Sequence, residues 1–120
     1  NQRLLIGATQ LSLQEIIDQI HALGGLAIAC HIDRDSYSVI SQLGFVDDIP
    51  FDALEISHST GIKQGRLRFP ELSARPFIES SDAHFIRDIG QGFTEIFLEA
   101  GTISELKMAF EKMRGRHIRE

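Results

Sequence analysis

The chain has 120 residues, of which 42% are hydrophobic and 24% charged, and its formal net charge is -5. These values are typical of a soluble folded domain and exclude an intrinsically disordered chain. The acidic balance provides no overall field that attracts nucleic acid, so a polyanionic substrate would have to be held locally, by a metal ion or a small basic cluster. The single cysteine, Cys30, excludes an internal disulfide.

The termini and the apolar runs bear on location. No apolar run reaches the roughly 20 residues needed to cross a bilayer, and the N-terminus does not have the pattern of a secretion signal. We therefore expect one domain over residues 1–120, in the cytoplasm and without a membrane partner. The chain begins with Asn1 rather than Met, so we expect it to be a piece of a longer protein.

The first predicted elements are a helix and a buried strand. Ser12 and Glu15 have the spacing of a capping box, and the helix that follows should end at Gly24 and Gly25. Residues 26–30 are apolar at every position, which is typical of a parallel strand covered on both faces. The apolar residues at helical spacing are Leu13, Ile16, Ile17 and Ile20.

The helix–strand pattern then recurs. Residues 37–43, preceded by Asp35 and Ser36 as candidate caps and followed by Gly44, predict a short helix, and residues 51–57 predict a strand. Residues 58–74 have no clean period, so we expect a long loop with at most one helical turn.

The last third predicts two strands and a helix. The strands are residues 77–80 and 94–98, and a second capping box at Thr102 opens a helix that Gly115 closes. We expect the basic residues of 114–120 to complement the dipole of that helix and to have no chemical role. Strands that alternate with helices indicate an α/β fold of parallel strands. The predicted apolar face of the last helix consists of Leu106, Phe110 and Met113.

Polar residues follow the strands at the edge where active sites of parallel α/β folds lie. Asp82 and His84 project to the same side of an extended segment and offer one carboxylate and one imidazole. Such mixed ligands suit Zn, Mn or Fe. The alternative is a capped strand end whose aspartate accepts backbone N–H bonds.

His31 follows the first strand in the same way. It is either a metal ligand or a hydrogen-bonded rim residue, and Asp33 repeats the two-residue spacing. Arg34 adds a forked donor suited to phosphate, unless Asp33 and Arg34 form a solvated pair beside Asp35. Strand alternation sends Cys30 to the face opposite His31, where we expect a core residue.

Two further features give weaker signals. His58 follows the second strand without an adjacent carboxylate, which makes a surface role the more common reading. Lys63, Arg66 and Arg68 could form an anion-binding patch, although a solvated loop is the more common explanation of such residues.

These residues resemble those of a known family. The run GGLAIACHIDR at 24–34, the strand FDALEIS and above all SSDAH at 80–84 are similar to the C-terminal portion of a PHP (polymerase and histidinol phosphatase) domain. The family consists of metal-dependent phosphoesterases built as distorted β/α barrels. The resemblance extends from about Ser12 to the last helix.

The resemblance implies a fold, a reaction and a set of ligands. The chain would form part of a β/α barrel whose intact form binds two or three divalent metal ions, with His31, Asp82 and His84 as ligands. Metal-activated hydroxide would attack the phosphorus of a phosphate ester, either a small molecule or a nucleic-acid end. Asp82 would orient the water, and Arg34 would bind the phosphate. His84 would either ligate a metal ion or protonate the leaving oxygen.

The family's first two motifs, an H-x-H and a later histidine, have no counterpart in this sequence. We therefore expect metal binding by these 120 residues to be weak or absent and the isolated chain to be inactive. Two alternatives stay open: a non-catalytic PHP-like binding or assembly module, and another barrel metallohydrolase such as an amidohydrolase. Exposed strand edges of a partial barrel would also permit a homo-oligomer.

Overall fold

The computed structural model describes residues 9–44, 46 and 48–119. None of the helices in these residues has the length and apolar character that crossing a bilayer requires. The α-helices are α1 (Leu13–Ala22), α2 (Val39–Leu43), α3 (Ile62–Arg68) and α4 (Ile103–Phe110); the 3-10 helices are η1 (Pro70–Leu72) and η2 (Ile86–Asp88); and the strands are β1 (Ile28–Ala29), β2 (Ala53–Ser57), β3 (Phe77–Ser80), β4 (Ile96–Phe97) and β5 (His117–Ile118).

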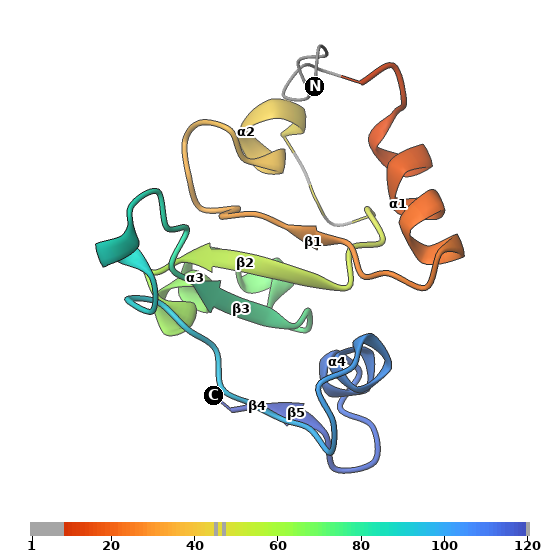
Figure 1. Cartoon of the computed structure of the whole chain (residues 1–120). Helices are drawn as coiled ribbons and strands as arrows, with labels where there is room; N and C mark the ends of the chain where they lie inside the picture. The colour runs from red at the N-terminus through yellow and green to blue at the C-terminus, as the bar shows by residue number, and fades with distance from the viewer. Residues whose placement is uncertain (1–8, 45, 47, 120) are drawn as a thin grey trace.

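A three-stranded parallel sheet, in the order β1-β2-β3, organises the fold (Figure 1). Ala29 pairs with Leu54, and Leu54 pairs with Phe77, so the strands run side by side in register. The predicted mixed α/β fold with parallel strands is confirmed for these three strands. Their carboxyl ends therefore lie at one edge, which we call the rim.

The last strands do not continue this sheet. β4 pairs antiparallel with β5, with Ile96 opposite Ile118. The expectation of a further parallel strand at 94–98 is therefore wrong. The chain reverses after α4 through Lys112, Arg114 and Gly115, which all have positive φ, and this reversal brings residues 117–118 back beside β4.

The basic segment after α4 is also different from the prediction. Arg116 pairs with Glu105 at 2.9 Å and with Glu99 at 2.6 Å, so it ties the end of the chain to the start of α4 instead of complementing the helix dipole. Thr102 does cap α4, but the Glu105 carboxylate bonds to Arg116 and to the N–H of Glu99, so the expected reciprocal capping box is only half formed.

The helix starts follow the sequence closely where caps are present. Ser12 and Glu15 form the full capping box of α1, and Gly44 ends α2 in the left-handed conformation. α2 begins at the cap Ser38, a few residues later than predicted.

The predicted loop at 58–74 is wrong, because α3 and η1 occupy much of it. Gly65 hides the helical pattern in the sequence, yet the structure needs it. A Cβ atom at this position would lie 2.6 Å from the side chain of Ile56, so only glycine lets α3 approach β2 this closely.

One face of the sheet is covered and the other is covered only in part. Leu54 and Ile56 point into the main core beneath α3 and η1, whereas Ala53 packs with Phe110 and Ile118 on the second face. Ile28 and Cys30 are exposed, so the prediction that residues 26–30 are buried on both faces is wrong. The buried residues of the main core are Ala29, Ile32, Val46, Leu54, Ile56, Leu72 and Phe77.

Asp33 fixes the chain after β1 to the end of β2. Its carboxylate accepts hydrogen bonds from the N–H of Ser57 at 2.8 Å and from the hydroxyl of Thr60 at 2.6 Å. Arg68 donates to its carbonyl oxygen at 2.9 Å. Burial raises the pKa of Asp33, but the hydrogen bonds from Thr60 and Ser57 outweigh burial and hold the pKa below its usual range.

We expect Asp33→Ala to destabilise the protein by about 1–3 kcal/mol, because the buried N–H of Ser57 loses its acceptor. Urea unfolding at neutral pH measures the change. Asp35→Ala is the matched control, because the fully exposed Asp35 pairs with Arg68 alone among the described residues, at 3.8 Å, and its loss should be nearly neutral. Equal losses for the two variants would contradict the role of Asp33.

The same carboxylate makes the fold sensitive to acid. A folded pKa below the unfolded value of about 3.9 means that Asp33 stabilises the fold above that pH and that this contribution is lost as the pH falls through the folded pKa. We expect unfolding free energies of Asp33→Asn to fall less steeply than those of the unmodified protein below about pH 4. Parallel curves would show that Asp33 does not contribute.

Candidate functional site

The rim collects the segments that follow β1, β2 and β3, and the arrowheads of β2 and β3 point to the same side in Figure 1. Two predicted ligands, His31 and Asp82, lie where the chain leaves β1 and β3. His31 has φ 27° and Asp82 has φ 45°, both in the left-handed region that residues other than glycine rarely adopt. Backbone strain of this kind persists only where the surrounding structure enforces it, and it concentrates at functional sites.

An ion pair joins the two segments. Nη2 of Arg34 lies 2.5 Å from Oδ2 of Asp82, so the loop after β1 reaches the loop after β3. Oδ2 of Asp82 is itself buried, and the two groups meet at ion-pair distance without hydrogen-bond alignment. The backbone N–H of Arg34 also donates to the carbonyl oxygen of His31, which closes a turn directly after β1.

The two histidines present ring nitrogens in different ways. Nδ1 of His84 is 2.8 Å from the carbonyl oxygen of Asp82. A carbonyl can only accept, so Nδ1 carries the proton, and the neutral ring keeps its lone pair on Nε2, the form that ligates a metal. Nδ1 of His31 is buried and has no hydrogen-bond partner among the residues that the structure describes.

The SDAH segment is held by the loop that follows it. The Ser81 hydroxyl donates to the carbonyl oxygen of Gly92 at 2.9 Å and accepts from the N–H of Gly90 at 2.8 Å. Gly92 passes so near the end of β3 that a Cβ atom there would lie 2.6 Å from the carbonyl oxygen of Ser80. The loop can therefore close on β3 only with glycine at this position.

His58 has a carboxylate partner that the local sequence did not reveal. Its Nδ1 lies 3.3 Å from Oε1 of Glu79, which is on the neighbouring strand β3. The pair arises from the parallel register, because Glu79 lies opposite Ile56, two residues before His58. Among the described residues, His58 forms no hydrogen bond or ion pair with His31 or Asp82.

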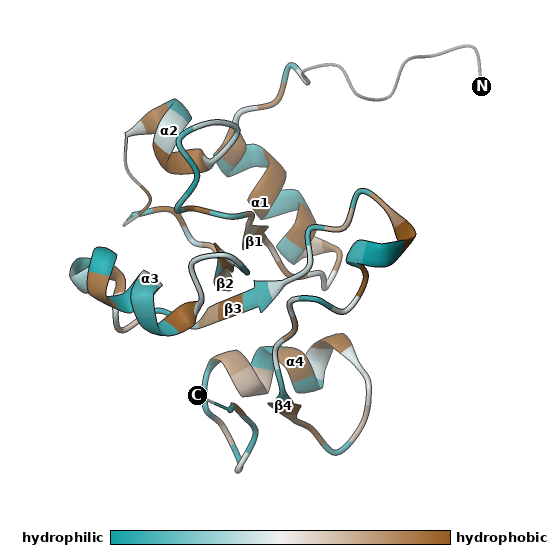
Figure 2. Cartoon of the chain, turned by 90° about the vertical axis from the view of Figure 1, so that its left-hand side faces the viewer, coloured by the Kyte–Doolittle hydropathy of each residue, from teal (hydrophilic) through white to brown (hydrophobic). Residues whose placement is uncertain are grey.

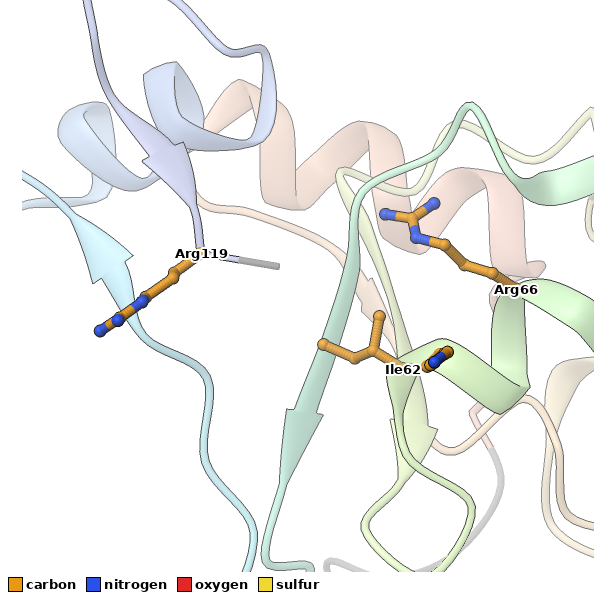
Figure 3. Close-up of a pocket in the computed structure, with 4 residues that line it drawn as sticks. Ile62, Arg66 and Arg119 are labelled. Atoms are coloured by element: carbon orange, nitrogen blue, oxygen red, sulfur yellow. The ribbon is translucent and has the colours of Figure 1, made fainter.

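The three basic residues of 63–68 do not converge on one anion site. Arg68 turns to Asp33 and Asp35, while Arg66 donates to the carbonyl oxygen of Ser73 at 2.5 Å. Lys63 and Arg66 line a cavity of about 310 Å³ together with Ile62 and Arg119. Figure 3 shows the guanidinium of Arg119 directed away from Ile62 and Arg66, consistent with its 3.0 Å ion pair to Glu95.

Cys30 is not the core residue that strand alternation suggested. It is exposed at the end of β1, because the second face of the sheet is uncovered there. Burial of part of the side chain raises the pKa of the Cys30 thiol, and the negative charges of Glu55 and Asp82 raise it further.

Glu55 is the residue that the sequence reading missed. It is the middle residue of β2 and is only 8% exposed. The sequence signal for Glu55 is a charged residue between apolar neighbours within a strand. Burial of an ionised group at such a position is costly and requires a partner.

The chemistry of these side chains suits a divalent metal ion, but their arrangement is incomplete. The described residues contain no group of three His, Cys, Asp or Glu side chains that could hold one ion. The fitting features are the free Nε2 side of His84, the buried Nδ1 of His31 and the Asp82 carboxylate, which already holds a cationic group. Further ligands would have to come from outside the described residues.

Comparison with known proteins supports one part of the resemblance directly. Residues 68–113, which include the SDAH segment, match the family model PHP_C, described as PHP-associated. The match leaves out the segment that carries His31 and Arg34.

The chain is also 29% identical over 116 residues to "Uncharacterized protein YqxK" of Bacillus subtilis (strain 168). The similarity covers 92% of this chain but only 29% of that longer protein. No solved structure matches the chain. Residues 68–113 are thus PHP-associated in sequence, consistent with the predicted C-terminal portion of a PHP domain.

Proposed function

We propose that this chain is the C-terminal part of a PHP-type, metal-dependent phosphoesterase whose β/α barrel and metal site are completed by residues outside the chain. The observation that carries the proposal is the ion pair between Arg34 and Asp82, because it unites a phosphate-binding type of side chain with a predicted metal ligand at the rim. The PHP-associated match at 68–113 supports the family context.

His31, Asp82 and His84 would hold the metal ions. When bound, divalent ions stabilise charge on phosphoryl oxygens and favour ionisation of water at neutral pH. The carbonyl oxygen of Asp82 keeps Nε2 of His84 directed away from its own backbone, toward a metal or toward a leaving-group oxygen. The Asp82 carboxylate would accept a hydrogen bond from the attacking water and thereby orient it.

Arg34 would bind the substrate. Its side chain is 45% exposed and its guanidinium pairs with one carboxylate, so a phosphate group can approach the remaining N–H donors from solvent. Two phosphate oxygens match the fork of the guanidinium, which favours a phosphate ester over an uncharged amide as the substrate. An amidohydrolase, the other barrel metallohydrolase considered above, would not need this donor to bind an uncharged amide.

A second candidate rests on a different observation. Phe85, Ile86, Ile89 and Phe93 follow the SDAH segment and are all more than half exposed. Figure 2 shows η2 as a partly hydrophobic segment at the periphery of the described fold. Apolar side chains in this number are typical of a contact surface, so a non-catalytic assembly module is the alternative to a phosphoesterase.

The first test compares hydrolysis of p-nitrophenyl phosphate and bis-p-nitrophenyl phosphate, with added Mn²⁺, by the isolated chain and by the full-length protein. We expect no turnover by the chain and metal-dependent turnover by the full-length protein. Asp82→Asn should lower the full-length rate by about 100-fold or more, since it removes a ligand charge. Asp35→Asn is the control carboxylate and should leave the rate unchanged.

Turnover by the isolated chain would overturn the proposal that the site needs further residues. Absence of phosphatase and phosphodiesterase activity from the full-length protein, with Mn²⁺ and both substrates in excess, would favour the assembly module.

The second test concerns Arg34. We expect Arg34→Ala to weaken inhibition of the full-length protein by inorganic phosphate by about 10-fold or more, because a charge-assisted hydrogen bond is worth about 1.5–3 kcal/mol. Arg34→Lys should recover only part of the loss, since lysine lacks the fork. Arg87→Ala is the matched control, because Arg87 is 81% exposed and contacts Asp88 and the ring of Phe85. Unchanged inhibition in Arg34→Ala would rule out Arg34 as the phosphate-binding residue.

A further inference from the structure

Glu55 is a buried carboxylate that the proposed chemistry leaves without a role. It lies in the centre of β2, the middle strand of the parallel sheet, and is only 8% exposed. Among the residues that the structure describes, its side chain accepts a hydrogen bond from Ser80 and forms no ion pair. An ionised group in such a place is stable only if a cation or several donors compensate its charge.

The side chain of Glu55 leans toward the rim. In the strand register Glu55 lies opposite Ile78, and Ser80 lies opposite Ser57. The Glu55 carboxylate nevertheless bonds to the hydroxyl of Ser80, two residues closer to the end of β3. Glu55 therefore holds the last residue of β3, two positions before Asp82.

The backbone of Glu55 holds the other half of the candidate site. Its carbonyl oxygen accepts from the N–H of Ile32 at 2.8 Å, directly after His31. One residue thus contacts both segments that carry predicted ligands, through its main chain on the β1 side and through its side chain on the β3 side.

We propose that Glu55 is a positioning residue of the metal site, which orients the start of the SDAH segment through Ser80 and adds negative charge that favours a divalent cation beside Asp82. This inference rests on the proposed function. Glu55 acts through Ser80 and through its field, and it need not touch the metal itself. Among the described residues Glu55 has no cationic partner, and a bound cation would offset the free-energy cost of burying its charge.

The test separates the charge of Glu55 from its hydrogen bond. Glu55→Gln keeps the shape and the acceptor for Ser80 but removes the charge, whereas Ser80→Ala keeps the charge and removes the donor. Mn²⁺ binding to the full-length protein is followed by the electron paramagnetic resonance signal of free Mn²⁺, with thermal unfolding recorded alongside. We expect about 10- to 100-fold weaker binding in Glu55→Gln, a smaller loss in Ser80→Ala and no loss of thermal stability in Glu55→Gln.

Glu95→Gln serves as the control, because Glu95 is exposed and pairs with Arg119. A merely structural role for Glu55 predicts the opposite pattern: lower thermal stability of Glu55→Gln with Mn²⁺ affinity within twofold of the unmodified protein. That pattern would overturn the inference. If Glu55→Gln fails to fold, unchanged Mn²⁺ affinity in Ser80→Ala overturns the orienting role on its own.

Asp82→Asn distinguishes failure of this inference from failure of the proposed function. Loss of Mn²⁺ binding in Asp82→Asn with unchanged binding in Glu55→Gln would leave the phosphoesterase proposal standing and reject only the role of Glu55. Absence of Mn²⁺ binding by the unmodified full-length protein would reject both.

Discussion

The parallel pairing of β1, β2 and β3 is the constraint on which the candidate site depends. Parallel strands end at one edge, so segments far apart in the sequence meet there without any specific contact having to draw them together. The ion pair between Arg34 and Asp82 then fixes how the first and third segments approach each other. Asp33 adds a second constraint, because its buried carboxylate ties the segment after β1 to the backbone at the end of β2. The rim is thus built from a few buried or half-buried polar contacts placed on an apolar sheet.

The electrostatics of the rim follow from what covers each face of that sheet. The first face is closed by α3 and η1, and it carries apolar side chains alone in the main core. The second face is closed by apolar residues only near Ala53, so the positions closer to the rim are left to Cys30 and Glu55. Glu55 lies in this region, whereas Asp33 and Asp82 lie in the segments that follow β1 and β3 at the rim. Among the described residues, Arg34 pairs with Asp82. Negative charge in a partly buried place favours a divalent cation, which is the physical basis of the proposed metal site.

The sequence predicts the parts of the fold that depend on local patterns. The capping box at Ser12 and the left-handed Gly44 are local signals, and the structure confirms both. The helix α3 was missed because Gly65, which reads as a helix breaker, is required by close packing on Ile56, a contact that no local pattern contains. The antiparallel β5 was missed for a similar reason, since it depends on a reversal near Gly115 and on pairing with β4.

The candidate site, like the fold, could be predicted only in part from the sequence. His31, Asp82 and His84 could be proposed from strand ends and two-residue spacing, and their position at the rim follows from the parallel sheet. The side-chain pairs around them could not be predicted. Glu55 meets Ser80, and His58 meets Glu79, only through the register of the strands.

Anomalous diffraction from crystals of the full-length protein soaked in Mn²⁺ tests the central claim most directly. The account predicts a manganese peak at the carboxyl ends of β1 and β3, within bonding distance of Asp82 and an imidazole nitrogen of His31 or His84, with Arg34 moved away from the carboxylate. Manganese bound elsewhere, while Arg34 and Asp82 stay paired, would contradict it.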